Sequence, residues 1–225
     1  MQEIIKQVYD EERIRSELYY VISRKLYGIL AKDQDKTPYT ISWELYDKLF
    51  TEDKPNLGIM FMSMAFISER RNNKAATIKF FNSAIEILDK NLNTKDIELL
   101  LLAHESLINI YSKDGKTDKA TPHLVAYAKK RPEGFGDPKR ALYAEFPILP
   151  SNVKGRGKSH HASVRFDVDK NGFTTNITPL TTINIELADA LAEAIKKSRY
   201  APAIKDGQPV PMYRLKESIT IFTER

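Results

Sequence analysis

The sequence predicts an α+β protein in which an all-α helical-repeat domain precedes a small β-β-α-β domain. Residues 1–131 carry apolar side chains at helical spacing, with charged residues between them. Residues 131–138 are rich in proline and glycine. After them the apolar pattern changes to a period of two, interrupted by one more helical stripe. These observations predict domains at 1–132 and 146–225, joined by a linker at 133–145.

The N-terminal domain is expected to consist of helical hairpins with short loops. A first helical stripe recurs from Ile4 to Ile29, and a short helix is predicted around Trp43. Further helical runs are predicted at about 57–70, 73–90, 95–113 and 117–130. Repeated hairpins of this kind favour an α-solenoid.

One of these hairpins resembles a tetratricopeptide repeat. The residues that carry the spacing are Leu107, Tyr111, Gly115, Ala120, Leu124 and Pro132. Gly115 permits a tight turn, Ala120 permits close approach of two helices, and Pro132 ends the second helix. An irregular second copy is carried by Leu57, Gly58, Phe61, Phe81 and Ala84. The alternative interpretation is a generic helical bundle.

The C-terminal domain is predicted from the alternation of apolar and polar residues along its strands. Residues 162–168 alternate strictly between apolar and polar side chains, which predicts a half-buried strand. Residues 169–172, Asp-Lys-Asn-Gly, predict a hairpin turn, and residues 173–178 supply the second strand. A helix is predicted at 187–197 and a last strand at 215–222. This order gives a small antiparallel sheet with a helix on one face.

An ordered set of short motifs runs through the same residues. It comprises Phe146-Pro147, Val164–Asp169, Asn171-Gly172, Arg199–Ala203, Asp206–Val210 and Ile219–Phe222. Residues 146–225 thereby resemble the C-terminal domain of TonB-family proteins. Ser198 stands where the family usually has tryptophan, and His161-Ala162 stands where it usually has glycine. The family's anchor helix and proline-rich spacer are not present in this sequence.

The resemblance implies a periplasmic module that binds proteins, including outer-membrane transporters, and is not an enzyme. It implies that a partner segment adds to the last strand, because exposed sheet edges have unpaired backbone groups. The residues expected to take part are Arg199, Tyr200, Lys216, Ser218, Thr220 and Phe222. We expect a cell-envelope adaptor; the alternative is a TonB-type energy transducer whose membrane anchor lies outside this chain. A third hypothesis is a cytoplasmic enzyme or nucleic-acid binder.

Composition argues against several classes of function. The chain contains no cysteine, which excludes disulfides and thiolate chemistry. Its net charge is only +5, and the short basic run Lys154, Arg156 and Lys158 is interpreted as a solvated loop, so nucleic acid is not expected as a partner. The longest apolar stretch, Leu57–Ile67, is too short to span a membrane. Membrane attachment is therefore expected only through a segment outside this chain, with a signal or anchor encoded before Gln2.

No catalytic, cofactor-binding or metal-binding residues are predicted. The sequence lacks the usual nucleophile, phosphate-loop and zinc-protease motifs. Asp167 begins a pattern like that of an EF-hand loop, but Thr178 stands where calcium requires a bidentate glutamate. His160 and His161 are expected to be exposed loop residues, and neighbours on a strand would point to opposite faces in any case.

Overall fold

The computed structural model of the chain describes residues 55–90, 94–151, 153, 159–180 and 183–222. The helices expected around Ile4–Ile29 and Trp43, and the basic run at 154–158, lie outside these residues. The chain divides into two compact units, Met1–Ala103 and His104–Arg225. The expected linker lies inside the second unit, and a division of the chain at that linker stays a prediction.

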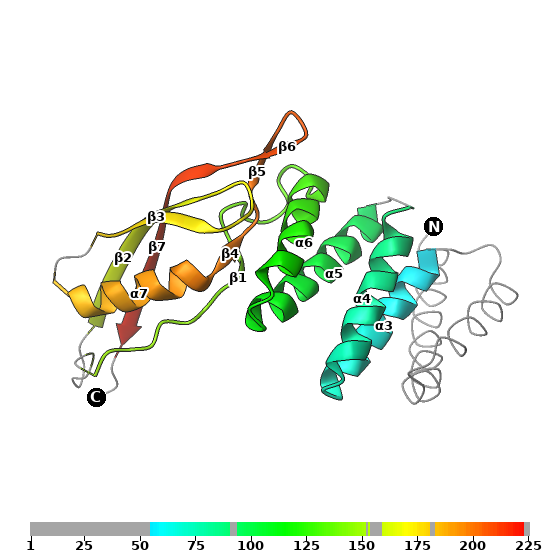
Figure 1. The fold of residues 1–225 in the computed structure, drawn as a ribbon, viewed down its shortest axis with the longest axis horizontal. Helices are drawn as coiled ribbons and strands as arrows, with labels where there is room; N and C mark the ends of the chain where they lie inside the picture. The colour runs from blue at the N-terminus through cyan, green and yellow to red at the C-terminus, as the bar shows by residue number, and fades with distance from the viewer. Residues whose placement is uncertain (1–54, 91–93, 152, 154–158, 181–182, 223–225) are drawn as a thin grey trace, which may run out of the picture. The chain divides into compact units, whose positions relative to one another are not determined.

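The first unit contains a helical hairpin and the beginning of a third helix (Figure 1). Helix α3 spans Pro55–Arg70, α4 spans Lys74–Leu88, and α5 spans Thr94–Lys113. Asn73 caps α4, because its side-chain oxygen accepts a hydrogen bond from the Ala76 N–H at 3.1 Å. The predicted helical runs are confirmed to within a few residues at each end.

Aromatic side chains hold α3 against α4. Phe61 stacks on Phe80 with ring centroids 6.3 Å apart, and Phe66 meets Phe81 edge to face at 5.4 Å. Gly58 permits this close approach, since a Cβ at that position would collide with the Leu88 side chain.

The second unit begins with the hairpin formed by the end of α5 and by α6, which spans Thr117–Lys130. Gly115 adopts a φ of +70° in the turn, and the Lys116 N–H closes it by donating to the Tyr111 carbonyl at 2.8 Å. Ala120 and Leu124 are fully buried. The hairpin has the form that the repeat pattern requires, while membership in the tetratricopeptide family stays a prediction.

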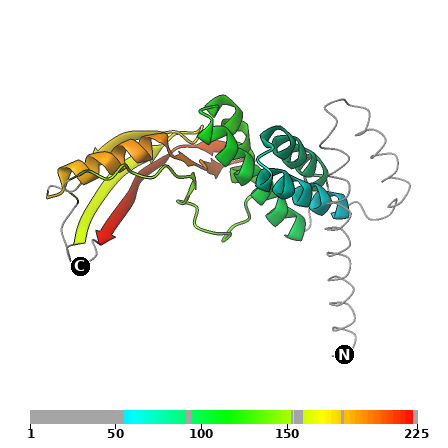
Figure 2. The same cartoon turned by 90° about the horizontal axis from the view of Figure 1, so that it is seen from below.

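A three-stranded antiparallel sheet forms the centre of the second unit. The strands are β2 (Ser159–Val168), β3 (Thr174–Pro179) and β7 (Met212–Phe222), in the order β3-β2-β7. Helix α7 (Ile185–Lys197) lies along one face of this sheet (Figures 1 and 2). The core between them comprises Ala162, Val164, Phe166, Val168, Leu187, Ala188, Leu191, Ile195, Tyr200 and Leu215. The predicted fold, helices followed by a β-β-α-β domain, is confirmed.

The turn between β2 and β3 is fixed by a single carboxylate. One Asp169 side-chain oxygen accepts hydrogen bonds from the Asn171 N–H at 2.8 Å and the Phe173 N–H at 2.9 Å. Gly172 adopts a φ of +81°, which favours glycine. The Asp-Lys-Asn-Gly segment therefore serves the hairpin, as the sequence pattern predicts.

Two pairs of short strands were not predicted. Strand β1 (Ala141–Tyr143) pairs with β4 (Arg199–Tyr200), and β5 (Ala203–Lys205) pairs with β6 (Gln208–Val210). Strand β1 brings the segment after residue 137 beside the end of α7. This placement forms one wall of a groove beside β7.

Candidate protein-binding edge and groove

Strand β7 lies at one edge of the sheet. It pairs antiparallel with β2 from Ser159↔Phe222 to Val168↔Met212. Among the residues that the structure describes, no strand pairs with its other side. From Leu215 to Phe222 the pairing has no register shift, so this edge is regular.

The orientation of the β7 backbone follows from a bond on the far side of β2. The Ser163 carbonyl accepts from the Leu180 N–H at 2.8 Å, on the side of β3. Both backbone groups of a residue in an antiparallel strand point to the same side. The neighbouring Ala162 and Val164 therefore face β7, where they pair with Ile219 and Glu217.

The backbone groups of Ser218 and Thr220 consequently face away from β2, toward the free side. Side-chain contacts support this assignment independently. The hydroxyls of Ser163 and Ser218 lie 3.0 Å apart, and His161 Nδ1 lies 3.1 Å from the Thr220 hydroxyl. Such short side-chain contacts are typical of the pairs in an antiparallel ladder that exchange no backbone bonds. The edge thus offers N–H and C=O groups at alternate residues.

The opposite edge of the sheet, β3, is irregular. Asn176 has a φ of +51°, Pro179 lacks an N–H, and the register with β2 shifts between Arg165 and Asp167. Prolines and bulges are the features that blunt an exposed edge against pairing. Of the two edges, β7 is therefore the one suited to receive another strand.

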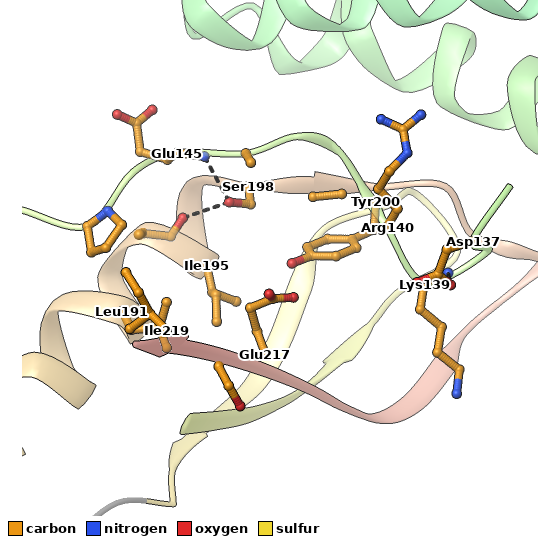
Figure 3. A pocket seen from close by; sticks show the side chains of 15 residues that line it. Asp137, Lys139, Arg140, Glu145, Leu191, Ile195, Ser198, Tyr200, Glu217 and Ile219 are labelled. Carbon is orange, nitrogen blue, oxygen red and sulfur yellow. Dashed lines mark hydrogen bonds between the residues drawn. The ribbon is translucent and has the colours of Figure 1, made fainter. Parts of the chain in front are cut away.

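A groove of about 480 Å³ runs along the free side of β7 (Figure 3). Strand β7 contributes Glu217, Ser218 and Ile219. The floor comes from α7 and β4, through Leu191, Ala194, Ile195, Ser198 and Tyr200. The opposite wall is formed by Asp137, Lys139, Arg140, Ala141, Ala144, Glu145 and Pro147.

Hydrogen bonds hold the opposite wall in place. The Glu145 N–H donates to the Ser198 hydroxyl at 3.1 Å, and that hydroxyl donates to the Ala194 carbonyl at 2.9 Å (Figure 3). The Tyr143 hydroxyl donates to the Glu145 carboxylate at 2.6 Å, which raises the pKa of Tyr143 to about 12. The later part of the expected linker, from residue 137 to 145, thus contributes to a wall of the groove.

Arg140 forms an ion pair within the second unit. Its two terminal nitrogens donate to the two Glu105 carboxylate oxygens at 2.8 and 2.9 Å, and this pairing raises the pKa of the guanidinium. Asn109 adds a second link from α5, donating to the Leu142 carbonyl at 2.9 Å.

The six residues expected to bind a partner fall into two groups. Lys216, Ser218, Thr220 and Phe222 are exposed along β7 on the face opposite α7, and Phe222 is 77% exposed. Arg199 and Tyr200 are each only 2% exposed. Arg199 is therefore covered by its neighbours, whereas Tyr200 lines the floor of the groove, and a role of either residue in partner binding stays a prediction.

Arg199 is buried in a cage of neutral acceptors. It donates to the Asn171 carbonyl at 2.9 Å and the Gly172 carbonyl at 3.3 Å, and its guanidinium lies 3.7 Å from the centre of the Phe173 ring. Burial lowers the pKa of the guanidinium to about 10. Tyr200 packs on Phe166 at 5.1 Å, and burial raises the pKa of its hydroxyl.

The histidine pair lies on β2 rather than in a loop, because this strand begins three residues earlier than the alternation indicated. His161 is exposed on the outer face, and His160 is half-buried on the inner face. Their opposite orientations agree with the pleat of a strand. Across the described ranges, no cluster of three or more His, Asp or Glu side chains is arranged to hold a metal ion.

A small α+β domain with an open sheet edge beside a groove belongs to the class of modules that bind extended protein segments. Residues 146–217 match the family described as Gram-negative bacterial TonB protein C-terminal. This part of the chain therefore resembles the TonB C-terminal domain, whose family consists of protein-interaction domains of the cell envelope. Comparisons with curated proteins and with solved structures gave no match. In the described part of the chain, no helix has both the length and the apolarity to cross a bilayer.

Proposed function

We propose that this chain is a periplasmic adaptor that captures an extended segment of another envelope protein on β7. The observation that carries the proposal is the outward-facing backbone of Ser218 and Thr220 along a preformed groove. A segment laid there would extend the sheet and satisfy backbone groups that otherwise bond only to water. In this account the helical hairpins bind a second protein, so that the chain connects two partners.

A TonB-type energy transducer is the second candidate. The description of the matched family favours it, since that family is named for the TonB protein itself. In that case the membrane anchor belongs to a segment outside this chain, and the captured protein is an outer-membrane transporter. Both candidates use the same edge of the same domain and differ in what the N-terminal part is attached to.

Site-specific photocrosslinking in the native envelope tests the shared claim. A photoreactive residue at Ser218 is expected to capture a partner through a short extended segment. The matched control is Thr175, which is exposed on the irregular β3 edge and should capture little. Capture at Thr175 but not at Ser218 would show that the wrong edge has been assigned.

Fractionation tests the compartment and separates the two candidates. The native protein should be found in the periplasm, released by osmotic shock if it is an adaptor and retained with the inner membrane if it is a transducer. A native protein confined to the cytoplasm would contradict both candidates.

A further inference from the structure

Glu217 occupies a position on β7 where the alternation calls for an apolar residue. Its neighbours on the same face are Leu215, which is 6% exposed, and Ile219, which is half-buried against the core. Glu217 shares their face but is exposed, because it lies where the groove opens beside β7. Figure 3 shows its carboxylate in the middle of the groove, between Ile219 and Tyr200.

The Glu217 carboxylate lies beside the Tyr200 side chain and apolar side chains of α7. Leu191, Ala194 and Ile195 of α7 line the same groove. Within the described residues, no lysine or arginine forms an ion pair with Glu217. The two cations of the opposite wall are directed elsewhere: Arg140 is paired with Glu105, and Lys139 extends away from Glu217 (Figure 3).

A largely apolar floor beside a carboxylate that forms no ion pair fits a particular kind of side chain. The methylene groups of lysine or arginine can lie along apolar surface while the charged end reaches an acceptor. A shorter or purely apolar side chain would cover the floor but leave the carboxylate desolvated and unpaired. An acidic side chain would add repulsion.

A strand bonded to Ser218 and Thr220 would present its side chains alternately to the groove and to the outer face of the sheet. The residue directly across from Glu217 on the groove side would lie within reach of the carboxylate. We infer that the groove selects extended protein segments with a lysine or arginine at this position. The inference rests on the proposed capture of a strand by β7 and specifies the partner's chemistry.

The same carboxylate disfavours a second copy as the occupant. Two β7 edges paired with each other would bring a Glu217 from each chain to the shared inner face, with no cation to match it. An inward-facing charge on an edge strand is a known means of preventing such self-association. The chain alone is therefore expected to be monomeric through this edge.

The test uses fluorescein-labelled ten-residue peptides of alternating threonine and valine that differ at one central residue: lysine, arginine, leucine or glutamate. Fluorescence anisotropy measures their affinity for the full chain. The lysine and arginine peptides should bind about tenfold more tightly than the glutamate peptide, as expected for a charged hydrogen bond of modest strength. Glu217→Gln should reduce them to the level of the leucine peptide, and Glu217→Lys should reverse the preference.

Glu193→Gln is the matched control, since Glu193 is an exposed residue of α7 paired only with Lys196 at 3.8 Å. It makes the same change of charge outside the groove and should leave the preference intact. If all four peptides bind the wild type with equal affinity and none binds Thr220→Pro, the selectivity is overturned while strand capture by β7 is supported. Failure of every peptide to bind would overturn both. A dimer in sedimentation velocity that dissociates in Thr220→Pro would make a second copy the occupant and overturn the selectivity.

Discussion

Arg199 and Thr121 are joined by a hydrogen bond of 2.9 Å that links the C-terminal domain to helix α6. Arg199 lies two residues after the end of α7, and Thr121 lies in the second turn of α6, 78 positions earlier in the sequence. The link connects the helical hairpin with the sheet inside the unit His104–Arg225. The buried guanidinium thus serves the architecture of this unit.

Truncation of Arg199 should destabilise the protein. Arg199→Ala removes three hydrogen bonds and the contact with Phe173 and leaves the Asn171 carbonyl without its donor, so we expect a loss of about 2–3 kcal/mol. Thr121→Val removes the acceptor on α6 and the bond from the Thr121 hydroxyl to the Thr117 carbonyl, and should cost about 1 kcal/mol. Urea denaturation of both variants measures this difference. An unchanged midpoint for Arg199→Ala would show that the cage contributes nothing to stability.

Limited proteolysis should cut the linker without separating its two sides. Glu133 and Gly134 are exposed, so a protease should cleave near them and yield fragments close to 1–132 and 146–225. The bonds from Glu105, Asn109 and Thr121 across to the later segment should keep the nicked fragments together in gel filtration. Fragments that separate and remain folded would instead support independent domains divided at the linker.

Acidification should loosen the hairpin of α5 and α6. His104 Nδ1 lies 3.0 Å from His123 Nδ1, so one ring must donate to the other and both cannot be protonated there. Burial lowers the pKa of His123 below its ordinary value of 6.5. The folded state therefore binds fewer protons than the unfolded one. The contribution to stability is complete above pH 6.5 and declines as the pH falls toward the folded pKa.

Melting temperatures from pH 7.5 to pH 5 check this expectation. His123→Gln should melt lower than the wild type at neutral pH but show a shallower decline on acidification, because the titrating ring is gone. The other histidines are present in both proteins, so their effects on the melting temperature cancel in the comparison. Parallel curves for the two proteins would mean that the pair does not sense pH.

Gly172 is required where the β2–β3 turn meets α6. A Cβ at this position would collide with the Tyr200 carbonyl and approach the Leu124 side chain to 3.1 Å. Gly172→Ala should therefore lower the free energy of unfolding by more than the roughly 1–2 kcal/mol that a left-handed backbone alone costs an L-residue. Gly134→Ala is the matched control, since its φ is +78° but its Cβ would meet nothing within 4 Å. Equal losses in denaturation experiments would contradict the close packing.

Much of this fold could be predicted because its main elements carry strong periodicity. The alternation of Val164, Phe166 and Val168 and the stripe of Leu187, Leu191 and Ile195 reflect burial on one face, which leaves a direct trace in the sequence. Strands β1 and β4 are three and two residues long, too short to show any period. They are defined by their pairing across the chain.

One part of the candidate site, the edge strand, could be predicted from the sequence, whereas the groove beside it could not. The edge strand follows from alternation, but the groove depends on a wall at 137–147 that folds back against α7, and no local pattern signals that contact. The burial of Arg199 likewise depends on carbonyl acceptors from a distant turn. Glu217 did leave a signal, because it interrupts the apolar alternation between Leu215 and Ile219. That interruption on an edge strand could have marked it as a binding residue.

Strand addition on β7 is tested by comparing Thr220→Pro with Thr220→Ala in partner capture. Proline removes an N–H that faces the free side of β7 and spares the ladder with β2, so circular dichroism should show a folded domain. Alanine removes the same hydroxyl contact with His161 but keeps the backbone donor. We expect Thr220→Pro to abolish capture of the crosslinked partner and Thr220→Ala to bind it within about twofold of the wild type. A folded Thr220→Pro protein that captures the partner with wild-type affinity would contradict strand addition on β7.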